Sequence, residues 1–116
     1  MSRRDPMVPM HHMLDHAREA VHFAQGRKRE DLETDRQFYL AMVQLIQIIG
    51  EAARRVPRES RSQWSNVPWA EVTGMRDRLI HGYDVVDLDF LWQTVTENLQ
   101  PLIVELEKIV PPVEPK

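Results

Sequence analysis

The 116-residue sequence contains no cysteine, which excludes disulfide bonds and thiolate metal sites. Long apolar runs are also missing, because the longest extend over only a few residues. The sequence therefore predicts neither a secretory signal peptide nor a membrane span. We expect one cytoplasmic domain over residues 1–116, with a single hydrophobic core and a short, frayed proline-rich tail over about 111–116.

An excess of positive charge is missing as well, since the formal net charge is −3. A protein with this balance does not coat nucleic acid through bulk charge, so any contact with RNA would have to be local. The sequence offers two local basic clusters. They are Arg27-Lys28-Arg29 and the group Arg54, Arg55, Arg58 and Arg61.

Apolar residues recur at three- and four-residue steps in four segments, which predicts four helices and almost no strand. The helices are expected from Pro6 or Pro9 to Gln25, from Thr34 or Asp35 to Pro57, from Pro68 to Gly82, and from Asp87 to about Val110. We expect one short helical turn between the second and third helices and a kink near Pro101. The predicted fold is all-α, an antiparallel bundle of about four helices.

The first predicted helix is rich in histidine, and His12 and His16 lie one turn apart, which is a metal-ligand spacing. No metalloprotease-type glutamate follows the first of them. Two histidines on a solvated helix face rarely form a metal site, so we expect neither a metal ion nor a cofactor.

The second predicted helix is apolar over well over half of its surface, whereas a helix in a small bundle needs only a stripe. We interpret the excess width as a second packing surface for a partner subunit. Gly50 lies inside this helix, where glycine costs about 1 kcal/mol relative to alanine. The interpretation that we favour for it is a close crossing with another helix.

The stretch from Gly74 to Tyr83 predicts the last turns of the third helix, closed by Gly82 in a left-handed conformation. On a helical projection Arg76 lies near the middle of an apolar arc, where an unpaired charge is costly. A second stripe, Ala70-Gly74-Asp77-His81, has small residues that would let another backbone come close. These residues fit either a salt-bridged core arginine with a histidine helix cap or a functional site.

Three segments together resemble the HepT-like branch of the HEPN ribonucleases. They are the sequence from Ile48 to Ala53, the stretch from Gly74 to Tyr83, and Val86-Asp87-Leu88-Asp89 followed by Trp92. The family motif is arginine, four residues, histidine, one residue, tyrosine. Arg76, His81 and Tyr83 fill its three positions, and the likeness extends over nearly the whole chain.

The resemblance implies a small all-α toxin, part of a type II-like toxin–antitoxin pair, that cuts RNA without a metal as a two-fold homodimer. It also implies a partner, a minimal nucleotidyltransferase antitoxin that silences the toxin by transferring AMP to Tyr83. The competing interpretation is a non-catalytic nucleotide- or partner-binding module, a companion subunit that presents Tyr83 to the nucleotidyltransferase and cuts nothing.

The chemistry of RNA cleavage agrees with these residue types. Attack by the 2′-hydroxyl needs a base, an acid for the leaving oxygen and positive charge at the phosphorane. His81 can supply the first two and Arg76 the third, and a two-fold dimer would bring two of each into one cleft.

Four further interpretations stay open at this level. Asp77 either orients Arg76 or His81 or faces water, and Arg78 either holds phosphate or is a surface charge. Glu51 is the best counter-ion for Arg76 from another helix. Tyr83 is either the modified residue or a side chain that packs back on the last helical turn.

Overall fold

Helices make up most of the computed structural model, which describes residues 5–81 and 85–112. The elements are α1 (Met7–Ala24), α2 (Asp31–Thr34), α3 (Arg36–Arg54), α4 (Arg58–Gln63), α5 (Trp69–Thr73), α6 (Met75–Leu79), β1 (Ile80–His81), β2 (Val85–Val86), α7 (Leu88–Gln93), the π-helical segment η1 (Thr94–Asn98) and α8 (Leu99–Ile109). The predicted all-α class is therefore confirmed. None of the helices in this described part is long and apolar enough to cross a membrane.

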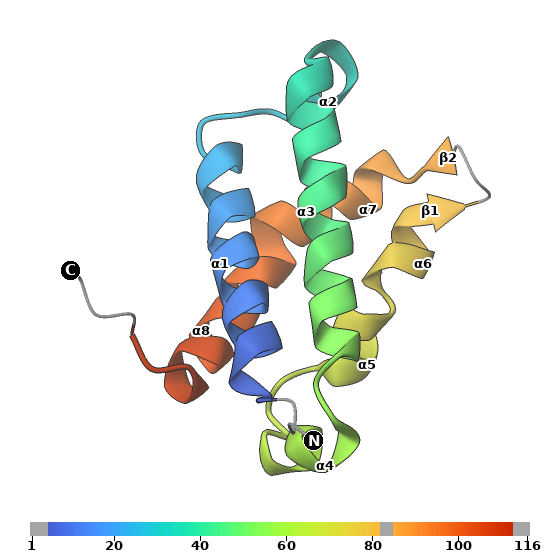
Figure 1. Ribbon diagram of the computed structural model, residues 1–116. Coiled ribbons are helices and arrows are strands. Elements are labelled where there is room, and N and C mark those ends of the chain that lie inside the picture. The colour runs from blue at the N-terminus through green and yellow to red at the C-terminus, as the bar shows by residue number, and fades with distance from the viewer. Residues whose placement is uncertain (1–4, 82–84, 113–116) are drawn as a thin grey trace.

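The bundle is built around α3 (Figure 1). The helix α1 lies antiparallel beside it, α5 and α6 pack on another side, and the run from α7 to α8 crosses behind and returns along α1. The core between these helices contains side chains with no exposed surface, among them Met10, Met13, Met42, Ile46 and Leu106. The antiparallel helical bundle predicted from the periodicity is thus present.

Local signals located most helix ends correctly. The residue Gly26, with φ of 74°, follows the end of α1, and the carboxylate of Asp35 accepts a hydrogen bond from the Phe38 backbone nitrogen (3.1 Å) at the start of α3. Asp87 caps α7 in the same way, through the Phe90 nitrogen at 2.9 Å. The short turn expected after Pro57 is α4. These ends were predictable because each depends on residues within one turn.

The third helix is not the continuous element that the sequence predicted. It ends at Thr73, resumes at Met75 and ends for good at Leu79, so Gly82 does not close it. A Cβ on Gly74 would lie 3.1 Å from the Ala70 carbonyl oxygen, which explains a glycine at the break between α5 and α6. The glycine of the stripe that ends at His81 forms this break, and whether the stripe lets the backbone of a partner subunit come close stays a prediction.

A two-residue antiparallel ribbon replaces the expected helix end and connector. In it Ile80 pairs with Val86 and His81 with Val85, and the Asp87 nitrogen donates to the Leu79 carbonyl oxygen at 2.8 Å. Ile80 has φ of −109° and ψ of 115°, which is extended backbone. The backbone of His81 is therefore held by its pairing with Val85 in the ribbon and not by a helix.

The fourth predicted helix runs from α7 to α8 with a π-helical interruption at Thr94–Asn98. Proline lacks the N–H group of the helical ladder, and its ring clashes with the carbonyl four residues earlier, which here belongs to Glu97. The wider π-helical turn lies where this clash arises. The irregularity expected near Pro101 is present, one turn earlier in the chain.

The wide apolar surface of α3 is covered largely within a single chain. One side packs on α1 and another on α5 and α6, so that Ile46 and Ala53 are both fully buried. The width of this surface is therefore no evidence for a partner subunit. Among the described residues of α3, Leu40 is the large apolar side chain left exposed, at 47%.

Gly50 marks a close crossing between α3 and the α5–α6 segment. A Cβ on Gly50 would lie 3.3 Å from the Val72 carbonyl oxygen and 4.0 Å from the Arg76 backbone nitrogen. The first contact is tight and involves helix backbone, which cannot turn aside as a flexible side chain can. The predicted helix crossing is confirmed, and it brings α3 against the start of α6.

We predict that Gly50→Val lowers the free energy of unfolding by about 1–3 kcal/mol, because its methyl groups would push α3 away from the Val72 carbonyl. Urea unfolding followed by circular dichroism measures the change. The matched control is Gln44→Val, at an exposed position of the same helix, which should change stability by about 0.5 kcal/mol or less. Equal stability of the two variants would contradict a close crossing.

Candidate functional site

Arg76 lies at the edge of the buried surface and not at its centre. Its side chain is 48% exposed, whereas Val72, Met75 and Leu79 are buried. Of the two alternatives, the salt-bridged core arginine is therefore excluded. The apolar arc is real, but the side that packs on α3 is centred on the three buried residues, and Arg76 projects beside it into solvent.

Asp77 lies between two arginines from different helices. Its carboxylate is 3.7 Å from the Arg76 guanidinium and 3.4 Å from that of Arg54, on α3. Arg54 also donates from Nε to the Thr73 carbonyl oxygen at 3.1 Å, which ties α3 to the end of α5. Of the two interpretations of Asp77, the contact with Arg76 is therefore present, although the carboxylate is also 69% exposed.

The structure describes only part of the other two motif residues, His81 and Tyr83. Of His81 the structure describes the backbone alone, in β1, and Tyr83 lies outside the described residues. The backbone of His81 follows Leu79 by two residues of extended chain. On one ideal helix, residues 76 and 81 would lie about 140° apart around the axis. That separation does not apply here, because the helix ends between them.

Arg78 and Glu51, the two other candidate site residues, form no hydrogen bond or ion pair with the Arg76 side chain within the described residues. Arg78 stacks over the Phe90 ring of α7, with 4.7 Å from its guanidinium carbon to the ring centre. Residues 76 and 78 are about 200° apart on a helix, so these arginines project to opposite sides of α6. In the described part of the chain Glu51 forms no ion pair with Arg76, so its predicted role as counter-ion was wrong. The neighbouring carboxylate of Asp77 takes that position.

The described residues contain no group of three or more histidine, cysteine, aspartate or glutamate side chains placed to hold a metal ion. In the histidine-rich first helix, His16 Nδ1 is hydrogen-bonded to the His12 carbonyl oxygen at 2.7 Å. That hydrogen bond occupies one of the ring nitrogens with which His12 and His16 could have bound a metal ion.

The site can thus present two guanidinium groups, from Arg76 and Arg54, where α3 crosses the start of α6, and the backbone of His81 follows the end of α6. Planar guanidinium groups match the oxygens of a phosphate, and a histidine imidazole can accept or donate a proton at neutral pH. This combination suits chemistry at a phosphodiester.

Comparison with known proteins agrees with this chemistry. The family model described as "Ribonuclease HepT-like" matches residues 13–109, most of the chain. The chain belongs to the HepT-like ribonuclease family. The match begins inside α1 and ends with the last residue of α8, so it covers the helices that build the HepT-like site.

Relatives extend over the same region. A Methanocaldococcus jannaschii protein named "Putative RNase MJ1216" is 29% identical over 116 residues, 100% of this chain and 96% of that protein. A Thermococcus cleftensis protein named "Probable ribonuclease HepT" is 38% identical over 80 residues, 69% of this chain and 73% of that one. "Putative RNase TTE0752" of Caldanaerobacter subterraneus subsp. tengcongensis is 33% identical over 107 residues, 92% and 96% of the two chains. No solved structure matches significantly.

Sequence reasoning did not connect Arg54 with this HepT-like site. It placed Arg54 in a basic cluster, although the structure brings it to Asp77. A usable signal was present, because Arg54 follows Gly50 by four residues and so lies on the same face of the helix, one turn beyond the predicted crossing. The spacing of Gly50 and Arg54 therefore indicates that Arg54 lies close to the segment that contains Arg76.

Proposed function

We propose that this HepT-like protein is the toxin of a toxin–antitoxin pair and a metal-independent endoribonuclease. In this mechanism His81 takes the proton from the 2′-hydroxyl, or donates one to the leaving 5′-oxygen, and Arg76 stabilises the charge of the phosphorane. The products are a 2′,3′-cyclic phosphate and a free 5′-hydroxyl. Because the attacking group belongs to the RNA itself, the reaction needs neither an activated water molecule nor a bound cation.

The observation that carries this proposal is the group formed by Arg76, Asp77 and Arg54 at the helix crossing. Asp77 contacts both guanidinium groups and can limit their rotation, so that less freedom is lost when they bind a phosphate. The group lies at the start of the five-residue α6, and the ribbon holds the backbone of His81 just past its other end. Family membership supports the same reaction class.

We further propose that the active form is a homodimer with a shared cleft. One protomer contributes a single histidine to the motif, whereas the reaction needs both a base and an acid. Two-fold pairing would supply the second histidine from the partner subunit. Two large apolar side chains remain about half exposed, Leu40 near the start of α3 at 47% and Val85 on β2 at 56%, and they offer a surface for such pairing.

Control is proposed to act through Tyr83, by a nucleotidyltransferase antitoxin that transfers AMP to its phenol oxygen. A protonated phenol is a poor nucleophile, so the antitoxin has to supply the base or metal. The added phosphodiester anion and purine would lie two residues from His81. The anion would compete with the substrate phosphate for the arginines, and the site would be silenced without refolding.

The central test is His81→Ala. We expect cleavage of cellular RNA by the purified dimer to fall by about 10²-fold or more, because acid–base catalysis contributes roughly that factor, while circular dichroism shows an intact fold. Excess EDTA should leave wild-type cleavage unchanged. Full activity in His81→Ala, or loss of activity with EDTA, would overturn the mechanism. Wild-type protein that cuts no RNA would instead favour the non-catalytic companion subunit.

The shared cleft makes a separate prediction for mixed dimers. Arg76→Ala and His81→Ala homodimers should each be nearly inactive, whereas a heterodimer regains some cleavage if each chain lends groups to both halves of the cleft. Subunit exchange followed by separation on two affinity tags prepares the heterodimer. A wild-type protein that is monomeric by light scattering, or a heterodimer as inactive as its parents, would contradict the shared cleft.

Removal of the Tyr83 hydroxyl tests the proposed silencing by the antitoxin. Tyr83→Phe should keep the fold and most of the cleavage, yet remain active when the antitoxin and ATP are supplied, because it lacks the oxygen that accepts AMP. Mass spectrometry should find added AMP on the wild-type protein and none on the variant. If Tyr83→Phe is silenced as completely as wild type, the antitoxin acts through binding or through another residue.

A further inference from the structure

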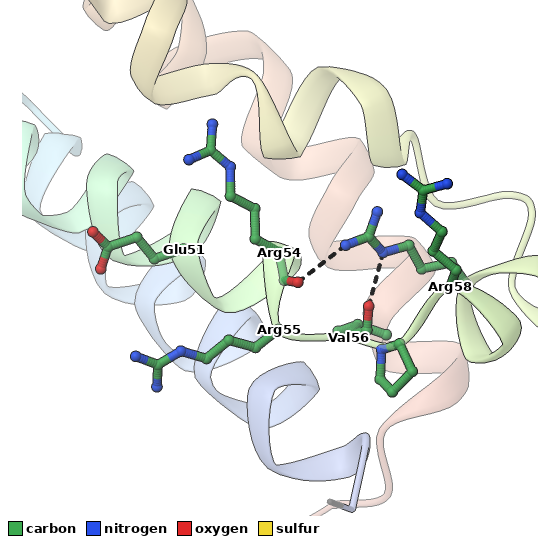
Figure 2. A pocket seen from close by; sticks show the side chains of 7 residues that line it. Glu51, Arg54, Arg55, Val56 and Arg58 are labelled. Carbon is green, nitrogen blue, oxygen red and sulfur yellow. Dashed lines mark hydrogen bonds between the residues drawn. The ribbon is translucent and has the colours of Figure 1, made fainter.

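A hollow of about 670 Å³ lies at the corner where α3 ends and α4 begins (Figure 2). We call it the arginine hollow. It is lined by Glu51, Arg54, Arg55, Val56, Pro57, Arg58 and Arg61. Four of these side chains are arginines and one is a carboxylate, so the lining is strongly positive in a chain whose net charge is −3. This concentration of positive charge needs an explanation.

One of the arginines has a structural role. Arg61 donates from Nε to the Val56 carbonyl oxygen at 2.9 Å, and from its terminal nitrogen to the carbonyl oxygens of Ala53 and Arg54. Ala53 and Arg54 are the last two residues of α3 and Val56 follows its C-cap, so Arg61 bonds to carbonyls at a helix end, where the regular helical partners run out. Arg61 therefore closes the C-terminal end of α3, and its charge remains beside the hollow.

Arg58 has no comparable role. Within the part of the chain that the structure describes, the Arg58 residue is exposed and its side chain makes no hydrogen bond or ion pair. In Figure 2 its side chain extends to the same side as that of Arg54, whereas Arg55 points away from both, toward α1. Arg55 also lines a separate hollow with Val8 and Pro9 of α1. Arg54 and Arg58 thus share one side of the corner.

The two arginines of the other basic cluster are neutralised by their own neighbours. Arg27 pairs with Asp35 and Asp31, and Arg29 pairs with Asp89 and Glu33. These carboxylates raise the pKa of both arginines above its ordinary value, through hydrogen bonds first and through charge second. An RNA phosphate would have to displace them. The hollow is therefore the basic cluster with guanidinium groups available for an anion.

The arginine hollow is continuous with the candidate site through Arg54. That side chain lines the hollow and also contacts Asp77, which in turn contacts Arg76. A polynucleotide whose phosphate lies at Arg76 therefore meets a further positive side chain in the direction of α4. Guanidinium groups bind phosphate oxygens in a planar fork, so arginine is well suited to this contact.

We propose that the arginine hollow binds the phosphodiester backbone of single-stranded RNA beside the bond that is cut, with Arg58 making the outer phosphate contact. The inference rests on the proposed ribonuclease function and extends it to a substrate-positioning surface. Arg54 joins the two parts, and Arg61 contributes charge from a fixed position. Contacts to phosphate carry no sequence information, so this surface strengthens binding without selecting bases.

The test measures binding of fluorescein-labelled single-stranded RNA by anisotropy, over a range of salt concentrations, in a His81→Ala background that does not cut the probe. Arg58→Gln should weaken binding by about tenfold and reduce the slope of log affinity against log salt by about 0.7, the loss of one phosphate contact. The matched control is Arg55→Gln, which removes the same charge three residues away and should leave the slope unchanged. Arg58→Lys should retain most of the slope.

Binding and cleavage separate this inference from the proposed function. In cleavage assays Arg58→Gln should raise the KM for long RNA, while a dinucleotide too short to reach the hollow is cut at the wild-type rate. If no RNA is cut but binding still depends on Arg58, the ribonuclease proposal fails and the hollow stands as an RNA-binding surface. Unchanged binding in Arg58→Gln, equal losses in Arg58→Gln and Arg55→Gln, or no RNA binding at all would overturn the inference.

Discussion

The close contact between α3 and the α5–α6 segment at Gly50 is the constraint on which the site depends. Because no side chain separates the two backbones there, the Val72 carbonyl and the Arg76 nitrogen come within reach of α3. One turn further along α3, Arg54 then reaches Asp77. A larger residue at the crossing would move these groups apart, although neither lies in the hydrophobic core. The packing of small residues thus determines an arrangement of charges.

The end of α3 combines a structural and a functional use of arginine. The last carbonyls of a helix carry partial negative charge, so cations are favourable there in any helical protein. Arg61 meets that need directly, through hydrogen bonds to three carbonyls. The Arg58 side chain is not used in this way, and it makes the outer phosphate contact of the proposed surface for RNA. Arg54 lines the same hollow as Arg58 and contacts Asp77, so it connects the positive charge of Arg58 with the proposed cleavage site.

Features set by neighbours in the sequence were predictable. The caps at Asp35 and Asp87 and the glycine after α1 act within one turn and appear where they were expected. The distortion expected from Pro101 also appears, one turn earlier in the chain. The ribbon was missed because its strands pair only two residues each and carry no alternating pattern. The end of α6 was misplaced for the same reason, since the pairing of Ile80 with Val86 competes with continued helix.

The sequence by itself determined the all-α class, the crossing at Gly50 and the identity of the motif residues, because periodicity, glycine and motif spacing are properties of the chain alone. Only the tertiary structure decided that Arg76 is half exposed, that Asp77 joins it to Arg54, and which basic cluster is available to an anion. Those outcomes depend on which carboxylate each guanidinium meets. That choice is made between helices distant in the sequence, where the electrostatic energy depends on distances that only packing fixes.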